Sequence, residues 1–208
     1  MSHVAVLGAS GDIGREVARI MVDRGNDVTA FVRRPGSARS VHVQEYVGDA
    51  REAEDVQRAL AGADAVVDVV GGGTLWRSDL ESTVIANVVA AMQLLRIKRL
   101  VAMSAGMVVK TNFILDCVLK PSIFRNILAE HRRVEAIVEV TELDWTLVRP
   151  PRLVSRAPRG YVVSSGARYS GSLSASRSDI AQFIADELIG NKFLRQAVFV
   201  SSDSRKGK

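Results

Sequence analysis

The sequence predicts an α/β fold in which a doubly wound, mostly parallel sheet carries helices on both faces. Apolar runs of strand length alternate with segments of helix length along most of the chain. A glycine-rich turn joins the first strand to the first helix, and the fourth strand runs into three more glycines. Parallel strands need long crossover connections, which helices supply, so this alternation is typical of βαβ units.

Each element is expected from its local pattern. Apolar or alternating runs predict strands at residues 4–7, 27–32, 43–47, 65–70, 100–104, 143–148 and 197–200. Helical periodicity predicts helices over residues 15–22, 53–60, 80–95 and 178–188, and a further helix around His131. We expect Ser178 or Asp179 near the cap of the last long helix. The apolar stretch 110–128 is expected to form either a helical lid or an oligomer surface.

The length fits one domain with a substantial core. Of 208 residues, 47% are hydrophobic and 25% are charged, as in ordinary globular proteins. We expect a single dinucleotide-binding domain over residues 1–208, with a small substrate-side portion from about 151 to 208 and a short disordered basic tail. The single cysteine, Cys117, is expected to be a buried hydrophobic residue.

Charge and hydropathy exclude several classes of protein. The net charge of +5 is modest and is spread along the chain, so nucleic acid is not an expected partner. An uncharged apolar run of membrane-spanning length is lacking, and the first strand begins almost at Met1 without a leader pattern. We therefore expect a cytoplasmic protein, not bound to membranes, that is a monomer or a homodimer. The three histidines lack paired ligand spacing, so no metal site is expected.

The turn after the first strand has the spacing of a phosphate-binding loop. Gly8 permits a sharp turn, Gly11 permits close approach of the backbone to a pyrophosphate, and Gly14 permits the helix to pack against the strand. The free N–H groups and the positive dipole end of that helix then face the anion. The sequence therefore predicts a dinucleotide site at this turn, formed by Gly8, Ser10, Gly11, Asp12, Ile13 and Gly14.

The end of the second strand indicates which dinucleotide binds. An acidic residue there accepts hydrogen bonds from a free ribose 2′-hydroxyl, whereas here the strand ends in Arg33 and Arg34. A guanidinium group forks onto a 2′-phosphate, and Arg15 is also within expected reach. NADP(H) is therefore favoured over NAD(H), with the alternative that Arg34 is an ordinary solvated charge.

These segments resemble the atypical short-chain dehydrogenases/reductases over nearly the whole chain. Within that NAD(P)H-binding group, the chain is similar to flavin reductase/biliverdin-IXβ reductase and to regulators of the nitrogen-metabolite-repression type. The resemblance implies a Rossmann-like fold. It is carried by GASGDIG (8–14), RRP (33–35), GDA (48–50), SAG (104–106), LDWTLVRPP (143–151) and RSDIA (177–181).

The resemblance also implies roles for individual residues. Asp49 and Ala50 would flank the adenine, Val70 and Gly71 would touch the nicotinamide ribose, and Ser104 would line the nicotinamide end. Pro150, in the Arg-Pro-Pro segment, is expected among the cofactor-binding residues.

The chain departs from the better-known enzymes of this superfamily in its proton donor. Those enzymes use a Tyr whose pKa is lowered by a Lys four residues later. Counting back from the Arg-Pro-Pro segment, Ile127 occupies the Tyr position and His131 the Lys position. His131 is therefore the candidate proton donor or ribose ligand, with an ordinary surface histidine as the alternative.

Two functions from different classes remain open. The first is an NADPH-dependent oxidoreductase that transfers hydride to a flavin, a quinone or a similar conjugated acceptor, because such acceptors need little chemical help from the protein. Ser104 and His131 would border the reacting ring. The second is a regulatory protein that senses NADP(H) without turnover, which the missing Tyr and Lys would also permit.

Overall fold

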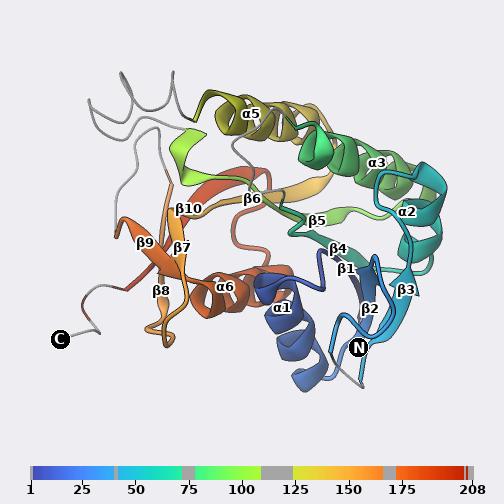
Figure 1. Ribbon diagram of the computed structural model, residues 1–208, viewed down its shortest axis with the longest axis horizontal. Coiled ribbons are helices and arrows are strands. Elements are labelled where there is room, and N and C mark those ends of the chain that lie inside the picture. Colours follow the sequence, from blue (N-terminus) through green and yellow to red (C-terminus); the bar gives the residue numbers. More distant parts are fainter. Residues whose placement is uncertain are drawn as a thin grey trace.

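The computed structural model describes residues 2–39, 42–71, 78–108, 124–165, 172–203 and 205. An eight-stranded sheet runs through its centre in the order β3-β2-β1-β4-β5-β6-β10-β8 (Figure 1). Its strands are parallel except β8, which pairs antiparallel with β10. The strand bounds are β1 His3–Leu7, β2 Asp27–Val32, β3 Gln44–Val47, β4 Ala65–Asp68, β5 Arg99–Met103, β6 Asp144–Arg149, β8 Tyr161–Ser164 and β10 Gln196–Ser202.

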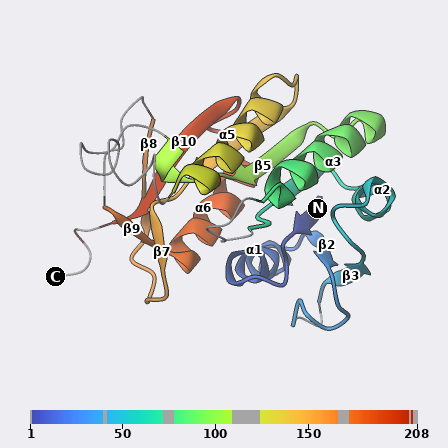
Figure 2. The same ribbon diagram turned by 45° about the horizontal axis from the view of Figure 1, so that its top comes forward.

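Helices cover both faces of the sheet, which confirms the predicted doubly wound fold. One face carries α1 (Asp12–Asp23) and α6 (Arg177–Gly190), and the other carries α2 (Ala53–Leu60), α3 (Leu80–Leu95) and α5 (Arg125–Glu139) (Figures 1 and 2). A 3₁₀ turn, η1 (Gly106–Val108), follows β5, and a separate two-stranded sheet pairs β7 (Arg152–Val154) with β9 (Ser174–Ser176).

Alternate residues of the central strands supply two hydrophobic clusters. Val4 and Val6 of β1 pack into the cluster beneath α1 and α6, whereas Ala5 and Leu7 pack toward α2 and α3. Strands buried on both faces read as continuous apolar runs, which is why the sequence reveals them clearly.

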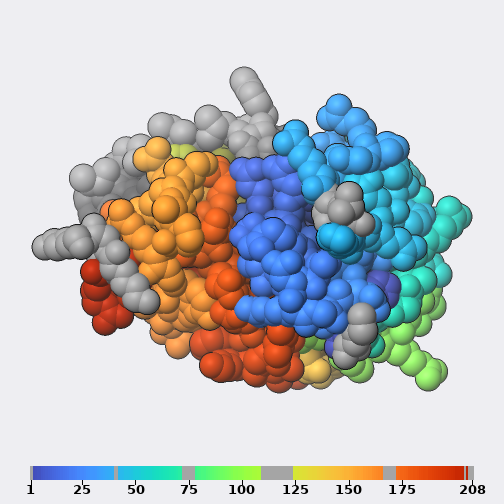
Figure 3. All heavy atoms as spheres, turned by 90° about the horizontal axis from the view of Figure 1, so that it is seen from below, coloured from blue at the N-terminus to red at the C-terminus, as the bar shows by residue number. Residues whose placement is uncertain are grey.

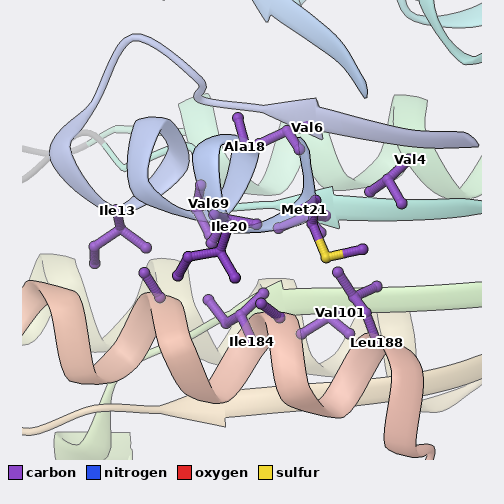
Figure 4. Packing of buried hydrophobic residues seen from close by; sticks show 14 of the residues in the cluster. Val4, Val6, Ile13, Ala18, Ile20, Met21, Val69, Val101, Ile184 and Leu188 are labelled. Atoms are coloured by element: carbon purple, nitrogen blue, oxygen red, sulfur yellow. The ribbon is translucent and has the colours of Figure 1, made fainter. Parts of the chain in front are cut away.

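The helices α1 and α6 pack directly against each other, although they stand near opposite ends of the sequence. The two segments lie side by side over one face of the molecule, in blue and orange-red in Figure 3. Ile20 and Met21 of α1 face Ile184 and Leu188 of α6 in the close-up of this cluster (Figure 4). This contact brings the start of α6 close to the glycine turn that begins α1.

Side-chain hydrogen bonds correct the predicted end of β4 and identify the cap of α6. β4 ends at Asp68 rather than at residue 70, because the Val70 N–H donates to Asp68 Oδ1 at 3.0 Å and turns the chain out of the ladder. The N-cap of α6 is Ser176, whose Oγ accepts the Asp179 N–H at 3.0 Å, so Ser178 and Asp179 lie near the cap as expected.

Several sequence expectations lie outside the described residues. They concern the last two glycines after β4 (72 and 73), most of the predicted lid with Cys117 (110–123) and most of the basic tail (206–208). Within the described part of the chain, no helix is both long and apolar enough to cross a membrane.

The contact between α1 and α6 leads to a prediction about stability. Ile184→Ala should lower the free energy of unfolding by about 2–5 kcal/mol, because the side chain is fully buried and its removal leaves a cavity. Ile189→Ala is the matched control on the same helix, where the side chain is 57% exposed and the expected change is within about 0.5 kcal/mol. Urea denaturation measures both, and equal effects of the two substitutions would contradict the packing.

Candidate cofactor site

The glycine turn brings three backbone segments together without room for side chains. Gly8 has φ +81°, and a Cβ placed there would lie 2.8 Å from the carbonyl carbon and oxygen of Val69. A Cβ on Gly14 would collide with the Gly8 carbonyl oxygen. The Gly11 N–H donates to that same oxygen at 2.9 Å, which closes the turn. These contacts are consistent with the glycine pattern that the sequence suggested for a dinucleotide-binding turn.

The start of α1 is open to an anion. Gly11 is the N-cap of the helix and provides no side-chain cap for the first-turn N–H groups. Those N–H groups lack intrahelical acceptors and lie at the positive end of the helix dipole. A pyrophosphate would satisfy them, so the turn suits a dinucleotide.

A cleft of about 580 Å³ opens at the carboxyl ends of the strands, above this turn. That edge is where open α/β sheets bind ligands. The cleft brings together most of the predicted cofactor residues, from the turn, the end of β2 and the loops after β3 and β4. They are Gly8, Ser10, Gly11, Asp12, Ile13, Gly14, Arg33, Asp49, Ala50, Val70 and Gly71.

The structure adds cleft residues that the sequence did not single out, namely Phe31, Val32, Arg51, Val69, Leu80, Val84 and Arg177. Arg177 is the most informative of them, because it comes from α6. Its Nε lies 3.5 Å from Asp12 Oδ2 and its Nη1 donates to Ser155 Oγ at 2.7 Å. In the sequence, the only signal for Arg177 is its place in the RSDIA segment. The packing of α6 on α1 places it at the cleft.

The loop after β3 is held by polar side chains. Asp55 Oδ2 accepts the Asp49 N–H at 2.9 Å, and Asn87 Nδ2 donates to the carbonyl oxygens of Ala50 and Arg51 at 3.1 and 2.8 Å. These bonds tie the loop to α2 and α3. The loop therefore presents Asp49 and Ala50 to the cleft in a fixed conformation.

A second cavity of about 470 Å³ adjoins the cleft, and Ser10 and Arg33 line both. Four arginines line it: Arg15, Arg33, Arg34 and Arg39. Arg15 pairs with Asp12 at 2.7 Å. Within the described residues, the guanidinium groups of the other three have no hydrogen-bond or ion-pair partner. We call this the arginine cavity; its positive charge suits a doubly negative phosphate.

The predicted catalytic residues lie outside the described lining of both cavities, as does Pro150. Ser104 follows β5 and is 3% exposed, and its Oγ has no hydrogen-bond partner among the described residues. His131 Nδ1 lies 3.2 Å from Glu81 Oε2 of α3, an ion-pair distance without the alignment of a hydrogen bond. The Pro150 carbonyl oxygen accepts the Gly106 N–H at 2.7 Å.

Two buried carboxylates fix the helix that carries His131. Glu130 Oε1 accepts the Ser82 N–H and hydroxyl at 2.8 and 2.9 Å, which ties α5 to the start of α3. Glu135 binds Arg149 of β6 through two bonds of 2.8 and 2.9 Å. The position of His131 beside Glu81 is therefore set by α3 and β6 together.

Asp68 is the buried carboxyl at the end of β4, next to the cleft residue Val70. Burial raises the pKa of Asp68 to about 7, the Val70 N–H opposes that rise, and the negative charge of Glu81 adds to it. Asp68 is therefore largely protonated in the folded protein below neutral pH.

The raised pKa of Asp68 predicts a pH-dependent stability difference. Between about pH 4 and pH 7 the unfolded chain loses the Asp68 proton and the folded chain keeps it, so this group makes stability fall as pH rises. Asp68→Asn should therefore gain stability relative to wild type by up to about 1.4 kcal/mol per pH unit across that window. Urea denaturation from pH 4 to pH 8 measures it, with the exposed Asp27→Asn as control; a constant difference would contradict the prediction.

Comparisons with known proteins agree with this geometry. A family model described as NAD(P)H-binding matches residues 8–189. A 2-alkyl-3-oxoalkanoate reductase of Shewanella oneidensis is 32% identical over 108 residues, covering 49% of this chain and 28% of that protein. The chain spans about a quarter of the length of the curated relatives it matches, between 22% and 28%.

Solved structures share the fold over nearly the whole chain. A short-chain dehydrogenase/reductase from Veillonella parvula in complex with NADP has a TM-score of 0.82 and 17% identity, covering 98% of this chain and 95% of that one. A proposed NADH-flavin reductase from Streptococcus pneumoniae has a TM-score of 0.79 and 19% identity, covering 98% and 100%. With the family match over most of its length, the chain belongs to the NAD(P)H-binding family and has its Rossmann-like fold.

Proposed function

We propose that the protein is an NADPH-dependent oxidoreductase that transfers hydride to a flavin, a quinone or a similar conjugated acceptor. Membership of the NAD(P)H-binding family and the reductase and dehydrogenase names of its relatives support oxidoreductase chemistry. The observation that carries the choice of NADPH is the arginine cavity adjoining the cleft, with three guanidinium groups that lack partners among the described residues.

Each part of the cleft has a role in this proposal. The glycine turn and the first turn of α1 bind the pyrophosphate, while Arg33 and Arg34 bind the 2′-phosphate. Asp49 and Ala50 flank the adenine, and Val70 and Gly71 contact the nicotinamide ribose.

The choice of acceptor follows from what α5 lacks. The positions of the usual Tyr and Lys are held by Ile127 and His131, one helical turn apart on α5. Bound NADPH would supply hydride, and a conjugated ring accepts it without a phenol to polarise a carbonyl. In the proposal, Ser104 and His131 border the acceptor, and His131 donates the proton that accompanies the hydride. The Glu81 carboxylate lies beside its imidazole ring, with Oε2 3.2 Å from Nδ1.

A sensor of NADP(H) without turnover is the second candidate. One observation favours it: neither Ser104 nor His131 lines the described cleft. A protein that only reports cofactor occupancy needs the glycine turn and the arginine cavity but no proton donor.

The cofactor preference is tested by binding. Arg33→Ala should weaken NADPH binding about 10-fold to 100-fold and leave NADH within about twofold, because only NADPH carries the phosphate that the guanidinium contacts. Isothermal titration calorimetry with both cofactors measures this. Arg58→Ala is the control, since Arg58 is exposed on α2 outside both cavities and pairs with Glu54. Equal weakening of both cofactors would overturn the 2′-phosphate role.

Turnover separates the two candidate functions. Wild-type protein should oxidise NADPH in the presence of FMN or a small quinone. The loss of absorbance of the reduced nicotinamide measures this reaction. His131→Ala should lower kcat about 10-fold to 100-fold with little change in NADPH affinity, as expected for loss of general acid catalysis. Tight NADPH binding without oxidation across a wide acceptor panel would support the sensor, and an unchanged kcat would remove His131 from the mechanism.

A further inference from the structure

The loop between β2 and β3 forms most of the wall of the arginine cavity. It contributes Arg33, Arg34, Ser37 and Arg39, whereas Arg15 comes from α1. The sequence pattern drew attention to Arg33 and Arg34, which directly follow β2, and to Arg15, but not to Arg39. Arg39 stands six residues beyond Arg33 along the chain, so its presence in the same cavity depends on how the loop folds back.

Glu45 of β3 holds this loop in its folded form. Its Oε2 accepts the Gly36 N–H at 2.6 Å, and its Oε1 accepts the Ala38 N–H at 2.8 Å. One carboxylate thus satisfies two backbone donors of the loop. Glu45 does not line the cavity itself, so any effect on a ligand must pass through the loop.

Two further contacts complete the loop. The Ser37 N–H and hydroxyl both donate to the Arg34 carbonyl oxygen, at 3.3 and 2.6 Å, which makes a tight turn. The Ala38 methyl group is 4% exposed and packs into the hydrophobic cluster beneath α1. The loop is therefore tied to β3 by Glu45 and to the core by Ala38.

Arg39 takes an unfavourable backbone conformation at the end of this loop. Its φ is +54°, in the left-handed region that a residue with a Cβ rarely adopts. Such a conformation persists where the surroundings fix it, and it is concentrated at ligand-binding sites. The contacts of Glu45 and Ala38 directly precede it and supply that constraint.

We infer that Glu45 is a specificity-determining positioning residue, which shapes the loop so that Arg39 joins Arg33 and Arg34 around the 2′-phosphate of NADPH. This inference rests on the proposed preference for NADPH. It adds a third phosphate-binding cation, Arg39, and a carboxylate that acts through the backbone. Glu45 keeps its negative charge, but both of its oxygens bond to loop N–H groups, and the four arginines that line the cavity outweigh one carboxylate.

The direction in which NADPH affinity changes when Glu45 is replaced distinguishes a positioning role from simple charge repulsion. Removing a carboxylate near an anion site should strengthen phosphate binding if only Coulomb repulsion matters. If Glu45 positions the loop, its removal should instead weaken NADPH binding. NADH lacks the 2′-phosphate, so its affinity reports whether the rest of the cleft is intact.

The experiment measures the dissociation constants of NADPH and NADH by calorimetry for wild type, Glu45→Ala, Glu45→Gln and Arg39→Ala. Glu45→Ala and Arg39→Ala should each raise the NADPH dissociation constant about tenfold and leave that of NADH within about twofold. Glu45→Gln keeps one acceptor oxygen and should fall between wild type and Glu45→Ala. The control is Asp64→Asn. The Asp64 carboxylate also accepts a backbone N–H, from His3 at 2.8 Å, but it lies at the amino ends of the strands, away from the cleft.

Failure of this inference is distinguishable from failure of the proposed function. If wild type binds NADPH and NADH equally, the proposed cofactor preference is wrong. If wild type prefers NADPH but Glu45→Ala keeps or increases that preference, the positioning role of Glu45 is overturned. If Glu45→Ala does not fold, Arg39→Ala still tests the third cation, and an unchanged NADPH affinity there overturns its role.

Discussion

The close contact among Gly8, Gly14 and Val69 is the constraint on which the rest of the site depends. The three backbones approach so closely that a Cβ at either glycine would collide with a neighbouring main chain. This contact sets α1 directly against the ends of β1 and β4, so the open N–H groups of its first turn face the cleft. It also fixes the distance from that turn to Arg33, which directly follows the adjacent strand β2. Cofactor binding geometry therefore follows from backbone packing before any side chain is considered.

The pairing of arginines distinguishes structural charges from those available to a ligand. Two arginines away from the cleft have dedicated carboxylates: the buried Arg99 pairs with Glu187 at 2.8 Å, and the half-buried Arg149 pairs with Glu135. The cavity beside the cleft differs, because most of its guanidinium groups have no partner within the described residues. Leaving like charges together costs free energy, which a bound phosphate would recover. The contrast supports the proposal that this cavity receives part of the cofactor.

Local sequence patterns predicted the helices and strands well where the burial of apolar residues alone determines the element. The central strands β1 and β4 are apolar because both of their faces are buried, and α2 and α3 have the predicted bounds. The predicted end of β4 was wrong because a side-chain hydrogen bond, from the Val70 N–H to Asp68, sets that boundary. The short strand β8 was missed although its residues Tyr161, Val162 and Val163 favour a strand; it lies at the edge of the sheet, where it pairs with β10.

The sequence by itself determined the α/β fold, the glycine turn and a basic end to β2, because each of these features depends on residues that are neighbours along the chain. Only the tertiary structure decided that Arg177 reaches the glycine turn, that Arg39 folds back beside Arg33, and that His131 stands against Glu81. These contacts join segments that are distant in sequence or separated by a folded loop. Their geometry is set by the packing of helices on the sheet and by bonds such as those of Glu45, which no local pattern encodes.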